Sequence, residues 1–480
     1  MIYLNGVNKA TDLDYYCFFI ETAERTSMKK NIVVCSLTAM SLLTACTNSS
    51  KIGSVNTNES VSNLNSDAQT EDIIITIPSN GDMINYAEEF NALDNGYKVV
   101  FKDYSDYFDS SYTDELGIAS PEAYFGIDEN ICLDIMKGNV LDIIPNYVFY
   151  DNAKYESLES KGAFVDLYSF MENDNEVNTT TLSEHILSLH EIDGKLYSLP
   201  LFFSINTLAG YSKFVGTKEN WTFDEMLEKW NMMPEGSTFN GKCTREYVYM
   251  CILRENIASF IDTQRKTVLF DSPEFLRYLE FINSFPAPLG YKEDISSGVT
   301  FVFPVTILNF QEYHGLLQNQ NNDDVTLVGY PNKDRSGAFI NSEGMRYSIS
   351  ASSPPEVQKG AWEFLKYFVE YEYQYEYSEN MFPVNNKAFE QRGIEAVINS
   401  KDTVLSIQGV EFEVPAFTTQ EYQRLLEYIP TINRKSCSSD YDVNKIINEE
   451  LFAMFYDEST PEEAAEFIQN RTSILVSERY

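Results

Sequence analysis

The stretch between residues 72 and 101 constrains the fold more than any other part of the sequence. Residues 72–77 form a short, β-branched apolar run, which is typical of a buried strand in a parallel sheet. A loop is predicted at 78–81, residues 82–92 repeat apolar side chains at helical spacing, and 97–101 form a second apolar run. Strand, loop, helix and strand in this order begin a βαβ unit, so we predict an α/β fold.

The same alternation continues to the end of the chain. Further helices are predicted at 128–136, 221–230, 272–284, 356–373 and 440–455, and further strands at 141–144 and 325–330. We expect Asn220 and Asp271 to cap the second and third of these helices. The Tyr-Glu alternation at 371–377 is interpreted as the end of the fourth helix rather than a strand. Trp221 and Trp362 are predicted to be structural.

Charge and residue counts narrow the classes of function. The net charge of −38 argues against nucleic acid and anionic membrane surfaces as partners. With three histidines and no metal-ligand spacing, we expect no metal site, no Ser-His-Asp machinery and no cofactor. Four cysteines follow residue 46 without any close pair, and we expect small buried residues rather than a disulfide framework, although the sequence leaves disulfides open: Cys132, Cys243, Cys251 and Cys437.

A signal-like segment lies near the start of the chain. Two lysines at 29–30 precede fifteen mostly apolar or small residues, 31–45, too few to span a bilayer. The segment ends in Leu-Thr-Ala-Cys at 43–46, which resembles a bacterial lipobox. We therefore predict a lipoprotein signal peptide at 28–45 and lipidation of Cys46. The alternative is a buried helix that happens to end in cysteine.

The residues on either side of this segment are predicted to lie outside the fold. Residues 1–27 place four carboxylates where a signal peptide should be basic, so we interpret them as a misannotated extension, with translation beginning at Met28. The alternative is a genuine long n-region. In 47–70, 14 of 24 residues are Ser, Thr or Asn, too polar to fold. Residues 46–70 are therefore predicted to be a lipid-anchored tether with a reach of roughly 25–30 Å.

Seven segments, in order, resemble those of family 1 extracellular solute-binding proteins. Each is a weak motif alone, and Leu141 stands where the family usually has proline. The segments are 130–144, Asp-Gly-Lys-Leu-Tyr-Ser-Leu-Pro at 193–200, Asn-Trp-Thr-Phe-Asp-Glu at 220–225, Gly-Tyr-Pro with Ser-Gly at 329–337, 349–365, Phe-Pro-Val at 382–384 and 446–471.

This resemblance implies a two-lobed, type II periplasmic-binding-protein-like fold, similar to maltose-binding protein, with the ligand between lobes that close on it. We place lobe 1 at 71–206 and 345–395, and lobe 2 at 207–344 and 396–480. The resemblance further implies a monomer, held at the outer face of the cell membrane by its lipid, that delivers a sugar or oligosaccharide to the permease subunits of an ABC transporter.

Candidate ligand contacts follow from where strands should end, because open α/β folds bind ligands at the carboxyl ends of strands. Ser79 and Asn80 follow the first strand, although simple turn chemistry explains them equally well. Tyr147 is the preferred stacking ring, since a sugar packs well on a ring that carries a hydroxyl. The remaining candidates are Asn146 and Tyr150 after the third strand, Ser204, Asn206, Arg346 and Tyr347 near the hinges, and Phe303 and Asn309 in the second lobe.

Two other classes of function stay open at this point. A surface-anchored, glycan-active enzyme would need a carboxylate pair in the cleft, and the 73 acidic residues make chance pairs unavoidable. A sensor or adhesin could use the same fold. The sequence does not identify the cargo, so peptides, polyamines and organic acids also remain possible.

Overall fold

The computed structural model describes residues 72–79, 84–114, 116–138, 140–262, 265–288, 298–318, 324–407, 410–436 and 441–479. They lie in one compact unit, Thr70–Tyr480. Several predictions fall outside the described residues: those for 1–27, 28–45, Cys46, the tether, Asn80 and Cys437.

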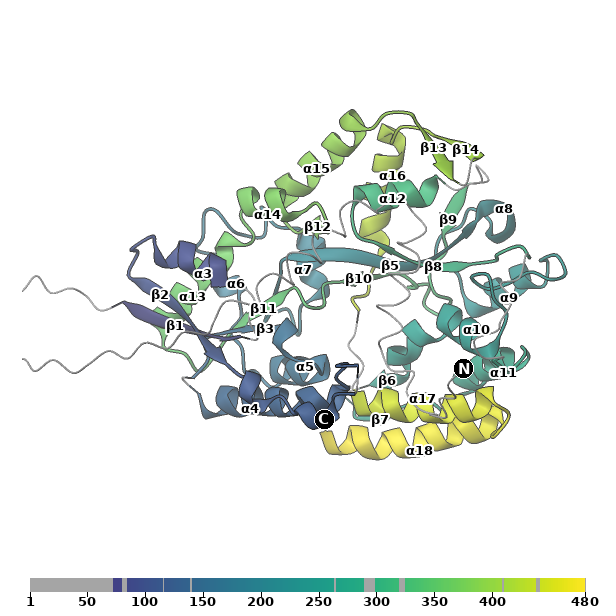
Figure 1. Ribbon diagram of the computed structural model, residues 1–480, viewed down its shortest axis with the longest axis horizontal. Helices are drawn as coiled ribbons and strands as arrows, with labels where there is room; N and C mark the ends of the chain where they lie inside the picture. Colours follow the sequence, from purple (N-terminus) through teal and green to yellow (C-terminus); the bar gives the residue numbers. More distant parts are fainter. Residues whose placement is uncertain are drawn as a thin grey trace, which may run out of the picture. The chain divides into compact units, whose positions relative to one another are not determined.

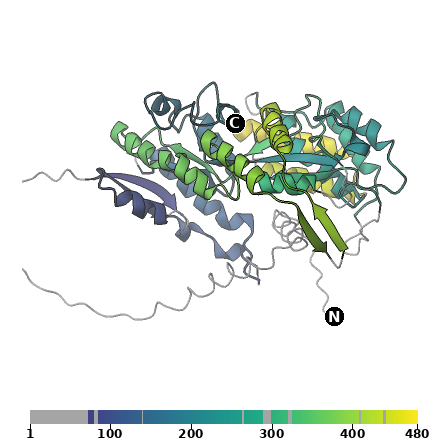
Figure 2. The same cartoon turned by 90° about the horizontal axis from the view of Figure 1, so that it is seen from above.

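The predicted βαβ unit is present at the start of this unit (Figures 1 and 2). Strand β1 (Ile73–Ser79) runs parallel to β2 (Tyr97–Asp103), and α3 (Ile84–Asn91) connects them. The next strand, β3 (Ile143–Pro145), follows Asp142, whose backbone N–H donates to Thr76 O at 2.8 Å and whose Oδ2 accepts from Thr76 N at 2.7 Å. Strand β11 (Arg346–Ile349) then pairs antiparallel with both β3 and β4 (Leu199–Pro200).

A long strand, β5 (Phe202–Tyr211), organises the second sheet. Nine of its ten residues are buried, which its nearly continuous run of apolar and small residues permits. It pairs antiparallel with β8 (Phe303–Ile307), β9 (Val325–Leu327), β10 (Phe339–Asn341) and β12 (Phe382–Pro383). Two further pairs of strands are β6 (Ile261–Asp262) with β7 (Thr267–Val268) and β13 (Thr403–Ile407) with β14 (Val410–Val414).

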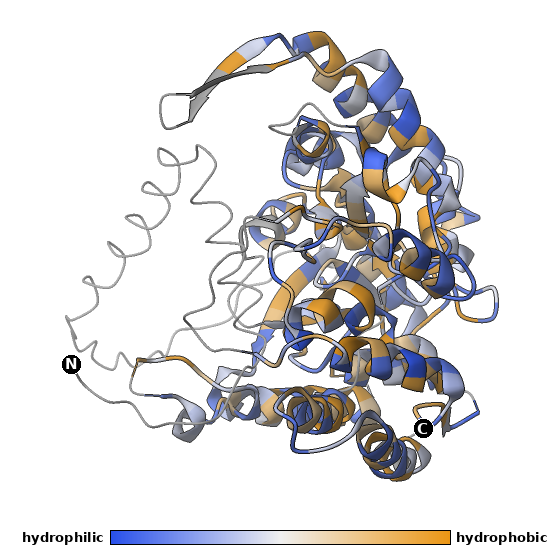
Figure 3. Ribbon diagram, turned by 90° about the vertical axis from the view of Figure 1, so that its right-hand side faces the viewer, coloured by the Kyte–Doolittle hydropathy of each residue, from blue (hydrophilic) through white to orange (hydrophobic). Residues whose placement is uncertain are grey.

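Helices of mixed polarity surround these strands, as the hydropathy colouring shows (Figure 3). Those not yet given are α4 (Phe125–Lys137), α5 (Asn152–Ser160), α6 (Tyr168–Met171), α7 (Glu184–Leu189), α8 (Ser212–Val215), α9 (Phe223–Trp230), α10 (Arg245–Ile252), α11 (Pro273–Asn283), α12 (Phe310–Leu317), α13 (Pro355–Tyr367), α14 (Tyr371–Tyr377), α15 (Asn386–Asn399), α16 (Thr419–Tyr428), α17 (Tyr441–Phe455) and α18 (Pro461–Arg479).

Buried apolar side chains form three cores. The first core extends along β1, the β11 sheet and β5, where it includes Ile205 and Ala209. The second core holds Leu208, from the same strand, together with apolar residues of α9–α11, α17 and α18. The third core lies between α4, β3 and α5. Strand β5 is thus shared by two cores. Because the first core also includes Phe310 from predicted lobe 2, the predicted lobe boundaries stay a prediction.

Two predicted helix caps are wrong. Asn220 lies at φ 55°, and the N-cap of α9 is instead Thr222, which forms a capping box with Glu225. The Thr-x-x-Glu spacing is visible in the sequence. At α11 the cap is Ser272, whose hydroxyl accepts from the backbone N–H of Phe275, followed by a proline at the first helical position. In both places the residue one or two positions later has the extended backbone that an N-cap needs.

The predicted helix at 356–373 is two helices. Helix α13 ends at Tyr367, and Glu370 adopts an extended backbone (φ −66°, ψ 155°) before α14 begins at Tyr371. The side chain of Gln374 holds this break, because its Nε2 donates to the carbonyl oxygens of Leu201 and Phe368, at 2.8 and 2.7 Å. The Tyr-Glu run is helical, as predicted, but it belongs to the second helix.

The tryptophan predictions are confirmed. Trp221 is buried and donates from Nε1 to Gly329 O at 2.7 Å, and Trp362 is buried and donates to Asp174 Oδ2 at 3.0 Å. Among the described cysteines, Cys132, Cys243 and Cys251 are free thiols. In the part of the chain that the structure describes, no helix is both long and apolar enough to cross a membrane.

Candidate ligand-binding site

Strand β5 brings two of the predicted contacts, Ser204 and Asn206, to the centre of the second sheet. Both are buried, and antiparallel register places Asn206 beside Phe339 on one side and Thr306 on the other. The Oδ1 atom of Asn206 is buried and has no hydrogen-bond partner among the described residues. Leaving such an acceptor unpaired costs about 1–3 kcal/mol, so this oxygen is a candidate acceptor for a ligand hydroxyl.

Two more residues, Ser342 and His190, have buried polar atoms without a hydrogen-bond partner among the described residues. Ser342, just after β10, is 2% exposed with an unpaired Oγ. His190, at the end of α7, is 3% exposed, and neither ring nitrogen has a partner. Burial lowers the pKa of His190 well below its ordinary value, and the charges of Lys435 and Arg346 lower it further. A neutral imidazole offers one donor and one acceptor, which suits a hydroxyl-bearing ligand.

Charged side chains lie beside these groups. The segment 434–436 runs along β10, because Ile340 N donates to Arg434 O at 2.9 Å and Ser436 N donates to Ile340 O at 2.7 Å. Burial raises the pKa of Glu343. The positive charge of Arg346 opposes this shift, and the negative charge of Glu255 adds to it. Burial likewise raises the pKa of Glu255. We call His190, Asn206, Glu255, Ser342, Glu343 and Lys435 the crossing-strand cluster.

Arg346 and Asn146 were predicted as ligand contacts, and each has partners inside the protein. The guanidinium of Arg346, 2% exposed, lies 3.2 Å from Glu159 Oε2, 3.6 Å from Glu156 and 5.2 Å from the centre of the Tyr155 ring. Its backbone N–H donates to Oδ1 of Asn146, which is fully buried. The side chains of Arg346 and Asn146 therefore have structural roles. Whether they also contact a ligand stays a prediction.

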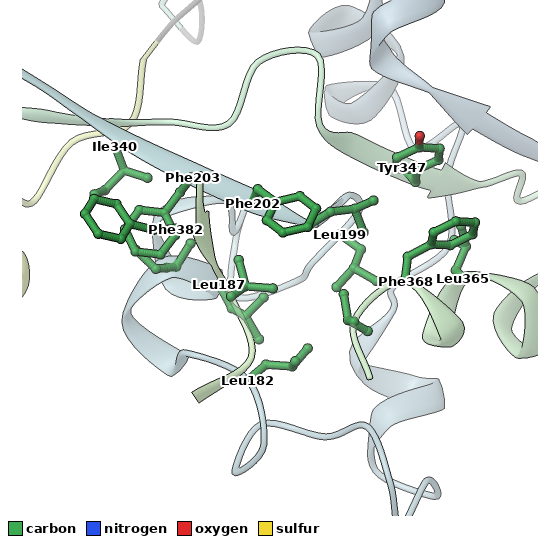
Figure 4. Packing of buried hydrophobic residues seen from close by; sticks show 14 of the residues in the cluster. Leu182, Leu187, Leu199, Phe202, Phe203, Ile340, Tyr347, Leu365, Phe368 and Phe382 are labelled. Atoms are coloured by element: carbon green, nitrogen blue, oxygen red, sulfur yellow. The ribbon is translucent and has the colours of Figure 1, made fainter. Parts of the chain in front are cut away.

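Three other predicted contacts also have structural roles. Tyr347 is buried and stacks on Phe368, with ring centroids 6.2 Å apart (Figure 4). Asn309 is the N-cap of α12: its Oδ1 accepts from Glu312 N, and its Nδ2 donates to Glu379 O, both at 2.9 Å. Phe303 is half-buried in β8, with its ring 5.9 Å from that of Tyr211. Ligand contact by these three residues stays a prediction.

Of the two candidate tyrosines after β3, Tyr150 is the more accessible. Tyr147 is half-buried and its ring meets Tyr347 edge-on at 6.1 Å, whereas Tyr150 is 38% exposed and stacks on Tyr124 at 5.0 Å. Asp128 fixes this turn, because its carboxylate accepts from the N–H of Tyr150 and of Asp151, both at 2.9 Å. Burial raises the pKa of Asp128 to about 6, although these bonds oppose the shift.

Sequence reasoning missed the aromatic residues around Tyr150. The ring of Phe125, at the start of α4, lies 5.3 Å from that of Tyr441, at the start of α17. We call Tyr124, Phe125, Tyr150 and Tyr441 the tyrosine cluster. One available signal was the density of tyrosines at 104, 107, 112 and 124 in a stretch without helical or strand periodicity. The remaining predicted residue, Ser79, is buried at the end of β1.

The described residues contain no group of three or more His, Cys, Asp or Glu side chains arranged to hold a metal ion. The crossing-strand cluster offers hydroxyl, amide, imidazole and carboxylate groups, and the tyrosine cluster offers partly exposed aromatic rings. This is binding chemistry for a polar ligand with an apolar face.

No protein-family model matches the sequence, and no curated protein shows a significant sequence match. Solved structures do match. A periplasmic oligogalacturonide-binding protein from Yersinia enterocolitica gives a TM-score of 0.52 at 14% identity, over 85% of this chain and all (100%) of the other. A de novo designed cysteine esterase gives 0.52 at 15% identity, over 85% and 98%. An ABC transporter solute-binding protein from Thermotoga lettingae, bound with α-D-tagatose, gives 0.45 at 14% identity, over 85% and 100%.

The chain therefore has the two-lobed α/β fold of periplasmic solute-binding proteins, as predicted. The oligogalacturonide-binding protein is similar to this chain in fold, at 14% sequence identity. The fold alone does not fix the chemistry, since a designed esterase shares it.

Proposed function

We propose that this protein is an extracellular solute-binding lipoprotein. It binds a small solute, a sugar or oligosaccharide, between its lobes and delivers it to an ABC permease. In this proposal Cys46 carries the lipid that holds the protein at the outer face of the cell membrane, and residues 46–70 are the tether. The protein acts as a monomer and catalyses no reaction.

The observation that carries the proposal is the unpaired state of buried polar atoms in the crossing-strand cluster. Asn206 Oδ1, Ser342 Oγ and both nitrogens of His190 lie where the strands cross, without partners among the described residues. Sugar hydroxyls are both donors and acceptors, so they suit each of these groups. The exposed ring of Tyr150 supplies a surface for the apolar face of a sugar.

A thermal-shift screen of neutral sugars, uronic acids, polyamines, peptides and organic acids tests the proposal. A ligand at a hundredfold excess over its Kd should add about 2.7 kcal/mol of stability. Asn206→Ala is the informative variant. It removes an unpaired acceptor, so the empty protein should be as stable as the wild type or more stable, while the response to the sugar should fall. Stabilisation by a polyamine or peptide but by no sugar would contradict the sugar assignment.

The alternative of a glycan-active enzyme is tested on the same samples. Any sugar that stabilises the protein should be recovered unchanged after long incubation, and release of new reducing ends would overturn the binding-protein proposal. The sensor or adhesin alternative predicts binding without transport. Uptake of the identified sugar should be lost in cells that lack the protein and restored by the wild-type chain.

A further inference from the structure

One contact in the tyrosine cluster joins two of the three cores. Helix α17 is anchored in the second core through Val443, Ile447 and Leu451. Helix α4 is anchored in the third core through Ile131 and Ile135. The first residue of each helix reaches the other helix, so the contact connects elements that are otherwise packed in different cores (Figure 1).

The contact combines an aromatic pair with a hydrogen bond. The rings of Phe125 and Tyr441 meet edge to face, with an interplanar angle of 74°. The Tyr441 hydroxyl donates to Oε1 of Glu122 at 3.3 Å, across 319 positions of sequence. The ammonium group of Lys154 lies 5.4 Å from the centre of the Phe125 ring. Burial, followed by the charge of Glu122, raises the pKa of Tyr441, which keeps its hydroxyl protonated and able to donate.

We propose that the contact of Tyr441 with Phe125 and Glu122 is a latch that holds the two lobes closed even without a ligand. The latch goes beyond the proposed function, because it requires only the two-lobed fold, with α4 in predicted lobe 1 and α17 in predicted lobe 2, and no particular cargo. An edge-to-face aromatic pair and one hydrogen bond together shift a two-state equilibrium by on the order of tenfold. Ligand binding then starts from an equilibrium that the latch has shifted toward the closed protein, and opening becomes slower.

The latch can be tested in the full-length chain with no solute added. Spin labels on introduced unnatural residues at Met136 of α4 and Ile474 of α18, both well exposed, report the distance between the two helices by pulsed electron resonance. Tyr441→Ala should populate a longer distance. Tyr441→Phe, which keeps the ring but loses the hydroxyl, should give an intermediate distribution.

Two further variants make the result specific. Glu122→Ala removes the acceptor from the other side and should lengthen the distance as Tyr441→Phe does, which keeps the test decisive if Tyr441→Ala fails to fold. Tyr456→Ala is the matched control, because Tyr456 follows the last residue of α17, is 51% exposed and stacks on Phe452 of that helix. Its distance should equal that of the wild type.

The proposal is overturned if Tyr441→Ala is folded and its distance distribution superimposes on that of the wild type. It is also overturned if Tyr456→Ala lengthens the distance as much as Tyr441→Ala does, since any perturbation of α17 would then have the same effect. Because no solute is present, a failure of the sugar proposal leaves this result unaffected.

Discussion

The backbone N–H of Arg346 donates to Oδ1 of Asn146 at 2.9 Å, across 200 positions of sequence, with both residues buried. This bond ties the start of β11 to the turn after β3, which carries Tyr147 and Tyr150. The Asn146 side chain, a predicted ligand contact, thus holds the turn that carries the rings of Tyr147 and Tyr150.

Asn146→Ala should therefore lower the free energy of unfolding by about 1–3 kcal/mol, because it leaves a buried backbone donor unpaired. Urea unfolding with the empty protein measures the change. Asn152→Ala is the control, since Asn152 is half-buried and accepts only a long 3.5 Å bond from Asn146. Loss of sugar binding with unchanged stability would show that Asn146 contacts the ligand instead.

Tyr150→Ala should weaken binding of the identified sugar by about 0.5–1.5 kcal/mol, the value of a stacking contact. The side chain is partly exposed, so the stability of the empty protein should change little. Calorimetric titration gives the affinity and thermal unfolding gives the stability. An unchanged Kd would remove Tyr150 from the site.

Tyr147→Ala should behave differently. The Tyr147 ring packs against residues of both the first and the third core, so its removal should cost about 1–3 kcal/mol of stability in the empty protein. A cleft ring that supports no core describes Tyr150 better than Tyr147, the stacking ring preferred from the sequence. A Tyr147→Ala protein of wild-type stability with weaker sugar binding would restore the first assignment.

His190 should make stability depend on pH in a predictable direction. Its pKa in the folded protein is lowered, so the unfolded chain binds the proton more readily. Its contribution is complete above its ordinary pKa of about 6.5 and is lost as the pH falls below that value. Asp128 acts in the opposite direction, because its raised pKa of about 6 adds stability as the pH falls.

The comparison of wild type with His190→Gln isolates the histidine from Asp128. Between pH 6.5 and 5 the wild type should lose up to about 1.4 kcal/mol per pH unit more than the variant. Unfolding curves at several pH values measure this difference. Parallel curves for the two proteins would mean that His190 is protonated or solvated in the folded state.

Cys46→Ala should prevent lipidation and release the protein from the membrane fraction. Metabolic labelling with a fatty acid, followed by fractionation, reads out both effects. Cys132→Ala is the control, because that half-buried thiol lies in α4 and is unrelated to processing. Continued labelling of the Cys46→Ala chain would contradict the lipobox assignment.

The fold was largely predictable, because it follows from local patterns of apolar and polar residues in the sequence. The β-branched run at 72–77 has few alternatives to a buried strand, and the ordered segments up to 471 placed the crossing strands. The boundaries that failed were set by a residue's backbone conformation, as at Asn220, or by a buried side chain far along the chain, as where Gln374 breaks the long helix.

The site was less predictable, because partners distant in sequence decide what a polar residue does. Arg346 looks available for a ligand until Glu159, 187 positions earlier, is placed beside it. Asn206 could be placed on a crossing strand from sequence, but its unpaired oxygen could not be foreseen. Tyr441 could not be identified at all, since its significance lies in residues 122 and 125.

The pairing of strand β5 also affects how this chain folds during its synthesis. Its partners on β8, β9, β10 and β12 come much later in the sequence, and the last of them, Pro383, pairs with Phe202. While the chain emerges, nine consecutive residues that are buried in the folded protein have no strand to pair with. Such late pairing between residues distant in sequence makes folding slow and leaves an aggregation-prone apolar segment exposed. Correct folding of this chain therefore depends on keeping residues 202–210 covered until the chain is nearly complete.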